Sequence, residues 1–175
     1  LQPIPMGIIV SSVMGAVLTL PISSAALSVS LGLSGIAAGA STVGCATQMI
    51  GFAVASYREN GFGGLLSQGL GTSMLQIPNI IKNPKIWIPP TLASAILGPI
   101  ASAVFKIEGS KLGAGMGTSG LVGQFDAVSV MGSSPRTLFL ILLMHIILPA
   151  SLTLLISEFM RKQGYLKPGD MKLNV

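Results

Sequence analysis

Few side chains in this sequence could do chemistry, and most of them lie inside apolar segments. Asp126 is the only acidic residue well within such a segment, and His145 is the only histidine. Ionisable groups inside a membrane are costly, so they are functional candidates by default. Asp126 could bind a substrate or a proton, and His145 could bind a substrate hydroxyl or relay a proton. Structural roles are the alternatives, because Asp126 could cap a helix and His145 could bond a neighbouring helix.

Amide side chains supply most of the remaining polar groups. Gln124 lies near Asp126 and offers both a donor and acceptors. Gln76 and Asn79 could line a cavity, although an interfacial helix would also explain them, and Gln48 could serve either function or packing. Mostly apolar pockets with a few well-placed polar groups are typical of small-molecule sites. The predicted substrate-binding residues are Gln76, Asn79, Gly117, Gly120, Gln124, Asp126 and His145.

Several kinds of site have no sequence pattern here. The glycine-rich stretch Gly113–Gly120 is not a phosphate-binding P-loop, because no Gly-Lys-Ser/Thr follows it. Cys45 is the only cysteine, so it cannot form an internal disulfide, and we expect it to pack as a small apolar residue. No basic cluster with interleaved aromatic residues indicates nucleic-acid binding. We therefore expect no catalytic residue, metal, cofactor or nucleic-acid partner.

The composition shows what must position these residues. No residue from Leu1 to Tyr57 carries a formal charge, and only 9% of the chain is charged. Soluble domains are roughly 25% charged. The mean hydropathy is +0.77. These values predict an all-α integral membrane protein.

Four stretches have about the length and apolar character of a membrane-crossing helix. The second of them has small residues four apart, as in helices that pack closely against other helices. Prolines should kink or interrupt the other three, as in many transporters, although proline is also common in membrane helices generally. The four stretches are Ile4–Leu31, Gly35–Tyr57, Ile86–Phe105 and Thr137–Phe159, and the three prolines are Pro21, Pro99 and Pro149.

Two weaker segments complete the predicted membrane domain. Leu65–Ile81 is too polar to face lipid comfortably, so we expect an interfacial or re-entrant helix, with Trp87 marking the membrane interface. Gly109–Ser134 is rich in glycine and makes a poor continuous helix. We expect it to form a re-entrant hairpin, with a glycine-rich descent, a turn near Gln124–Asp126 and a return helix ending near Gly132.

Basic residues predict the orientation. The segment after the fourth span is basic, which places it in the cytoplasm. With Leu65–Ile81 on the surface and the glycine-rich region re-entrant, seven of the ten basic residues lie inside, and Lys106, Lys111 and Arg136 lie outside. If the glycine-rich region instead spans fully, six lie inside and four outside, so the positive-inside rule slightly favours the hairpin. We therefore expect a membrane-embedded domain at residues 1–160 and a basic cytoplasmic tail at 161–175. Because the chain begins at Leu1, we also expect it to be part of a larger subunit.

Three segments of the sequence resemble a known family: Leu18–Ala26, Gln68–Asn79 and Gly117–Gln124. They resemble the IIC membrane subunits of the bacterial phosphotransferase system (PTS), in the branch described as perfringolysin O regulator-like. The resemblance covers most of the chain. It implies a multi-pass protein of the bacterial plasma membrane, in contact with lipid, that takes up a sugar and works with IIB and IIA proteins. It also implies a homodimer.

The resemblance implies that a IIB partner phosphorylates the sugar on the cytoplasmic side, with phosphate from phosphoenolpyruvate. Well-known IIC proteins pair a glutamate with a histidine at the sugar. Glu59, Glu108 and Glu158 all fall near segment ends, so we assign no catalytic glutamate. The leading hypothesis is a sugar permease. The alternatives are a membrane-embedded regulator that docks a partner on its tail, and an ion- or proton-coupled carrier.

Overall fold

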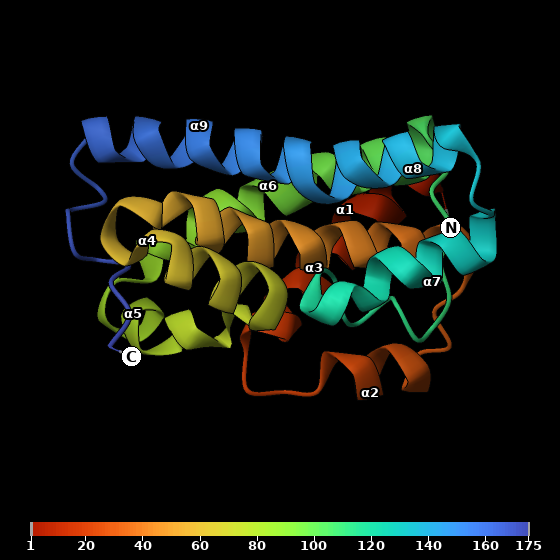
Figure 1. Ribbon diagram of the computed structural model, residues 1–175, viewed down its shortest axis with the longest axis horizontal. Helices are drawn as coiled ribbons and strands as arrows, with labels where there is room; N and C mark the ends of the chain where they lie inside the picture. Colours follow the sequence, from red (N-terminus) through yellow and green to blue (C-terminus); the bar gives the residue numbers. More distant parts are fainter. Residues whose placement is uncertain (1, 175) are drawn as a thin grey trace.

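Long apolar helices form the centre of the computed structural model (Figure 1), which describes residues 2–174. Three helical stretches are long and apolar enough to cross a membrane: Gly35–Ala55, Pro84–Val104 and Pro135–Lys162. A shorter apolar helix covers Pro3–Thr19. The described residues contain no β-strand, so the predicted all-α membrane fold is confirmed. Leu1 and Val175, the outermost residues of the two predicted parts, lie outside the described residues.

Nine α-helices and six shorter helical turns follow one another in the described part of the chain. The α-helices are α1 (Pro3–Thr19), α2 (Ser24–Ser30), α3 (Gly35–Ala55), α4 (Tyr57–Leu66), α5 (Ile77–Lys82), α6 (Ile88–Pro99), α7 (Val122–Met131), α8 (Pro135–Leu142) and α9 (Leu148–Lys162). The π turns are Ser67–Gly71, Ile100–Val104 and Leu143–Ile147, and the 3₁₀ turns are Ser73–Gln76, Pro84–Trp87 and Ser119–Leu121.

Helix α3 lies at the centre of the bundle, and most of its residues are buried. Its glycines let α1 approach closely, since a Cβ atom on Gly44 would collide with the backbone of Ser11. Two hydroxyls reinforce this crossing. Ser11 donates to the carbonyl of Ser94 (2.7 Å), and Ser94 donates to the carbonyl of Gly44 (3.2 Å). The prediction that this small-residue span packs against helices is therefore confirmed.

The three span prolines have different effects. Pro21 lies in a full interruption, because α1 ends at Thr19 and α2 begins only at Ser24. Pro99 and Pro149 instead lie next to π turns, and their spans continue through them. A wider turn can accommodate backbone groups that lose their partner at a proline. Only the interruption at Pro21 exposes a stretch of irregular backbone.

Residues Tyr57–Lys82 form a structure that we call the first hairpin. The chain runs inward along α4, turns at Thr72, which is extended (φ −158°, ψ 141°), and returns through α5 (Figure 1). Both arms contact the same end of the chain, because Asn60 and Asn79 donate to backbone carbonyls near the C-terminus, each at 2.9 Å. Of the two predicted alternatives, this fold favours a re-entrant segment. A single helix over Leu65–Ile81 is wrong, because the extended residue interrupts it.

The predicted glycine-rich hairpin is present and covers Gly109–Gly132, which we call the second hairpin. Its two ends meet where the Glu108 N–H approaches the Met131 sulfur (3.4 Å). The predicted turn near Gln124–Asp126 is wrong, because the chain reverses earlier and α7 already begins at Val122. Glycines explain the earlier turn: Gly117 and Gly120 adopt left-handed φ values of 56° and 54°.

The segment Gln163–Asn174, which we call the tail, packs against the first hairpin. Leu166 and Met171 are buried in one apolar cluster with Ile80 of this hairpin and with Phe52 and Ile86. The basic residues of the predicted tail are therefore carried partly by α9, which extends to Lys162, and partly by this packed segment. Its cytoplasmic location stays a prediction.

Candidate functional site

Three irregular backbone segments meet on one side of the bundle. They are the interruption after α1, the tip of the first hairpin and the descending arm of the second hairpin. Together they line a cavity of about 200 Å³ that is open to the surface, with residues such as Ile22, Thr72 and Met116 in its walls. In membrane proteins, irregular backbone is tolerated only where protein buries it or a cavity lies beside it. The first two lie within segments that carry the sequence resemblance, Leu18–Ala26 and Gln68–Asn79, and the third leads into Gly117–Gln124.

Hydrogen bonds join the three segments in a closed ring. Each segment is bonded to both of the others through a serine or threonine hydroxyl, so the walls of the cavity hold one another in place. Ser24 donates to the carbonyl of Gly115 (2.6 Å), Thr118 donates to the carbonyl of Gly69 (2.5 Å), and the hydroxyls of Thr19 and Ser73 lie 2.8 Å apart.

Local sequence explains why hydroxyls face this cavity. Pro21 cannot continue α1, so the chain restarts at α2, where Ser23 accepts a hydrogen bond from the Ala26 N–H (3.1 Å). At the tip of the first hairpin, Thr72 accepts from the Met74 N–H in the same way (3.1 Å). A hydroxyl has one donor and two acceptor positions. Both hydroxyls can therefore still donate a hydrogen bond to a ligand in the cavity.

Ser24 and Ser119 also line the cavity, and apart from these four hydroxyl residues and backbone groups the lining is apolar. Leu18 and Met49 come from α1 and α3, and Met74 and Met116 from the two hairpins. Among the described residues that line the cavity, none is charged. Methionine side chains adapt to irregular shapes. This lining suits a neutral ligand with several hydroxyl groups, bound by hydrogen bonds rather than by ion pairing.

Two predicted site residues lie elsewhere, at the base of the first hairpin. Gln76 donates to Gln68 Oε1 (2.8 Å) and to the carbonyl of Met171 (3.0 Å). Asn79 donates to Gln76 Oε1 (2.9 Å) and to the carbonyl of Lys172 (2.9 Å). These amides bond the tail to the first hairpin, and Gln68, which we did not single out from the sequence, connects them to α4.

Gln124 and His145 contact each other. Gln124 Nε2 lies 2.9 Å from His145 Nδ1, which joins the second hairpin to the span Pro135–Lys162. The His145 side chain is fully buried. Within residues 2–174, Gln124 Oε1 and His145 Nε2 are buried and have no hydrogen-bond partner. The pair thus joins the second hairpin to this span, and neither residue lines the cavity.

Asp126 holds the two arms of the second hairpin together. Its carboxylate accepts from the backbone N–H of Ser110 (2.7 Å) and from the Ser110 hydroxyl (2.5 Å). The hypothesis that Asp126 caps the return helix is wrong, because the helix begins at Val122 and Asp126 lies in its second turn. Asp126 bonds Ser110 whereas His145 bonds Gln124, so the two ionisable residues have separate partners.

The two predicted glycines differ in their surroundings. A Cβ atom on Gly117 would lie 2.7 Å from the carbonyl carbon of Cys45, so the loop packs directly on α3. Gly120 has only the Val122 side chain nearby, at 3.9 Å from such an atom. None of the seven predicted residues belongs to the cavity lining, and their role in substrate binding stays a prediction.

Sequence reasoning missed the hydroxyl residues that line the cavity. Ser23 and Ser24 follow Pro21 by two and three residues, and Thr72 follows Gly71, all within segments that carry the resemblance. Hydroxyl residues at such positions have two uses, since they cap the next helical turn and can still bind a ligand. That pattern could have identified them.

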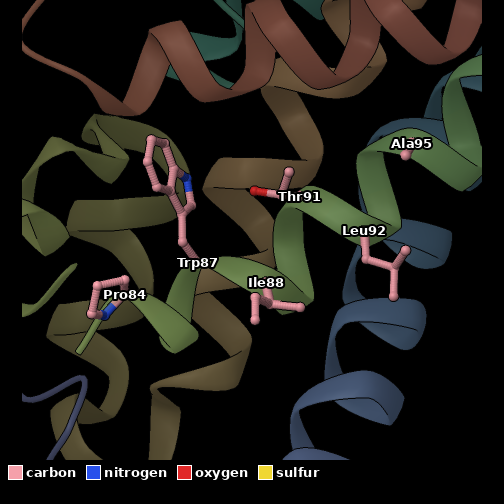
Figure 2. A pocket seen from close by; sticks show the side chains of 6 residues that line it. All are labelled: Pro84, Trp87, Ile88, Thr91, Leu92 and Ala95. Carbon is pink, nitrogen blue, oxygen red and sulfur yellow. The ribbon is translucent and has the colours of Figure 1, made fainter.

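A second groove lies on α6 and is lined by Pro84, Trp87, Ile88, Thr91, Leu92 and Ala95, with a volume of about 390 Å³ (Figure 2). Trp87 donates to Gln48 Oε1 (3.1 Å), and Gln48 donates to the Thr91 hydroxyl (3.0 Å). In Figure 2 the Trp87 nitrogen and the Thr91 oxygen face each other, while Ile88 and Leu92 point away from them. Apart from the Trp87 and Thr91 groups that bond Gln48, the lining of this groove is apolar, so it offers a ligand far fewer polar groups than the first cavity. We therefore do not assign the substrate to it.

Comparison with known families gives one match. The family model described as "Phosphotransferase system, EIIC" matches residues 1–173. No curated protein and no solved structure matches the chain. The matched residues include every helix of the structure and all three segments around the cavity.

Proposed function

Because this chain belongs to the phosphotransferase-system EIIC family, it is a membrane component of that transport system, and we propose that it binds a sugar in the cavity between α1 and the two hairpins. The convergence of three irregular backbone segments on one uncharged cavity supports this assignment. Broken helices near the middle of a transporter commonly offer backbone and hydroxyl groups to a substrate.

A sugar has the chemistry that this cavity would recognise. Its hydroxyls could accept from and donate to Ser23 and Thr72, and its C–H faces could pack on methionine side chains such as Met49 and Met116. The same cavity contains no carboxylate or imidazole among its described lining residues. We therefore propose that a cytoplasmic IIB partner supplies the chemistry of phosphorylation. The proposed location is the bacterial plasma membrane.

Binding can be tested by removing one hydroxyl from the cavity. Thr72→Val keeps the shape of the side chain but removes its hydroxyl, and we expect it to weaken sugar binding about tenfold. Sugar-dependent thermal stabilisation of the purified protein, across a panel of hexoses, hexitols and disaccharides, measures this loss. Ser129→Ala is the matched control, because this hydroxyl lies on α7 and donates to the carbonyl of Asp126 (2.8 Å), outside the cavity. Equal binding by the wild type and the Thr72 variant would contradict the assignment.

Transport separates this proposal from the proton-coupled alternative. Uptake of a labelled sugar should require phosphoenolpyruvate and a IIB partner, and it should survive collapse of the ion gradient. Loss of uptake on collapse would instead support a carrier. The geometry gives the carrier little support, because Asp126 and His145 bond different partners. The regulator hypothesis needs a tail that is free to bind a partner. Here Met171 of the tail is fully buried against the bundle, which gives that hypothesis little support.

A further inference from the structure

A cationic groove lies at the end of the bundle opposite the tail. It is bounded by the residues that follow the span Pro84–Val104 and by those that begin the span Pro135–Lys162. Lys106 and Arg136 both line it, and its volume is about 510 Å³. Because one span ends and the next begins beside this groove, it lies at the depth where lipid headgroups meet the protein.

The charge of the groove is of one sign. Lys106 and Arg136 are both exposed, and none of the ion pairs among residues 2–174 involves either of them. The nearest acid in the chain, Glu108, is not part of the described groove lining. Ser134 accepts from the Thr137 N–H (3.2 Å) at the start of α8, so the positive end of that helix also faces this region.

The surface next to the groove is apolar. Val104 lines the groove and is 66% exposed, while Phe139 and Leu142 on α8 are 59% and 47% exposed. Exposed apolar side chains on a membrane span contact acyl chains. A ligand that fits both surfaces has an anionic headgroup and a hydrocarbon tail.

We propose that this groove binds an anionic phospholipid, with the phosphate between Lys106 and Arg136 and an acyl chain along α8. Arginine binds a phosphate through two parallel hydrogen bonds, and lysine adds a compact charge. The site is separate from the sugar cavity, because the two share no described lining residue. Failure of the sugar assignment would therefore leave this proposal untouched.

The experiment compares phosphatidylglycerol with phosphatidylcholine, titrated into delipidated protein and detected as bound lipid by native mass spectrometry. The wild type should prefer phosphatidylglycerol. The double variant Lys106→Gln/Arg136→Gln should bind it about 30-fold more weakly. Lys111→Gln is the matched control, since it removes one exposed charge at the same end of the bundle from a residue outside the groove. It should change the affinity less than about twofold.

A second, more conservative variant distinguishes loss of lipid binding from a folding defect. Arg136→Lys keeps the charge but loses the paired donors, so it should bind phosphatidylglycerol between the wild type and the double variant. An equal loss in the Lys111 variant would overturn the proposal, because it would show attraction to net charge alone. Competition by inorganic phosphate or glycerol 3-phosphate at concentrations matching the lipid would also overturn it, since the site would then bind free phosphate.

Discussion

The two hairpins reach the same cavity from different anchors. The first hairpin is fixed at its base by side chains: Glu59 and Asn60 on α4 and Gln76 and Asn79 on the returning arm all bond the tail or α9. The second hairpin owes its shape mainly to glycine conformation. Its return helix α7 is largely exposed, and Phe125 on it is 70% exposed.

This difference indicates which wall of the cavity is rigid and which part can move. A hairpin with a bonded base holds its tip in place, and opening it would break many buried hydrogen bonds at once. In the second hairpin the descending arm is buried, but α7 has few buried residues, and a helix with few buried contacts opens at lower free energy. We therefore expect the first hairpin to be the fixed wall and α7 of the second hairpin to be the part that moves during transport.

The largest expected effect comes from breaking the base of the first hairpin. Glu59 and Arg161 form a nearly buried ion pair (3.1 Å, with side chains 8% and 13% exposed), and Glu59 also accepts from the Met171 N–H (2.8 Å). Glu59→Ala should lower the free energy of unfolding by about 3 kcal/mol, because the nearly buried Arg161 loses its closest carboxylate and keeps only Glu158, at 4.0 Å. Urea unfolding in detergent micelles measures this change.

Arg58→Ala provides the control for that prediction. Arg58 pairs with Glu158 at 3.1 Å, but its side chain is 71% exposed. Exposed ion pairs contribute about 0–1 kcal/mol, so this variant should be close to wild type. Equal losses in the two variants would show that the base of the first hairpin is not a special anchor.

The next effect concerns the turn of the second hairpin. Gly117→Ala should cost about 3 kcal/mol, because alanine is strained at φ 56° and its Cβ would crowd the backbone of Cys45. Gly120→Ala, at φ 54° with open space around it, should cost only about 1 kcal/mol. Gly117→Val should abolish uptake while the protein still inserts into the membrane, as tested by uptake at matched expression. Unchanged stability and uptake in the Gly117 variants would show that close contact with α3 is dispensable.

A smaller effect is expected at the link between the arms of the second hairpin. Asp126→Ala should cost about 2 kcal/mol, because the half-buried N–H of Ser110 loses its charged acceptor. Asp126→Asn should cost about 1 kcal/mol, since an amide can accept from that N–H and donate to the Ser110 hydroxyl. Thermal unfolding and uptake should change together in both variants. Loss of uptake by the asparagine variant at unchanged stability would instead make Asp126 a substrate or proton ligand.

The smallest effect is the coupling between Gln124 and His145. A double-mutant cycle of Gln124→Leu and His145→Leu should give a coupling energy of about 1 kcal/mol, the usual value of one buried hydrogen bond. The double variant should lose less free energy of unfolding than the sum of the losses in the two single variants. A coupling energy of zero would show that this hydrogen bond does not hold the second hairpin to the span Pro135–Lys162.

Several local features followed from the sequence because their causes are local. Pro21 cannot donate a backbone hydrogen bond, and the run of glycines at Gly113–Gly123 cannot hold a regular helix, so both irregular segments were predictable. The turn of the second hairpin was placed too late. A choice among several glycines depends on which one packs against α3, and that contact joins residues far apart in the chain.

The sequence by itself determined that this protein is a bundle of apolar helices in a membrane, where those helices are interrupted, and to which family it is similar. These properties depend on composition, periodicity and short segments. Only the tertiary structure decided which polar residues meet. It placed Gln76 and Asn79 against the tail, paired Gln124 with His145, and gave Asp126 to Ser110. A hydrogen bond extends about 3 Å, so a side chain's partner depends on how distant segments pack, which spacing along the chain does not specify.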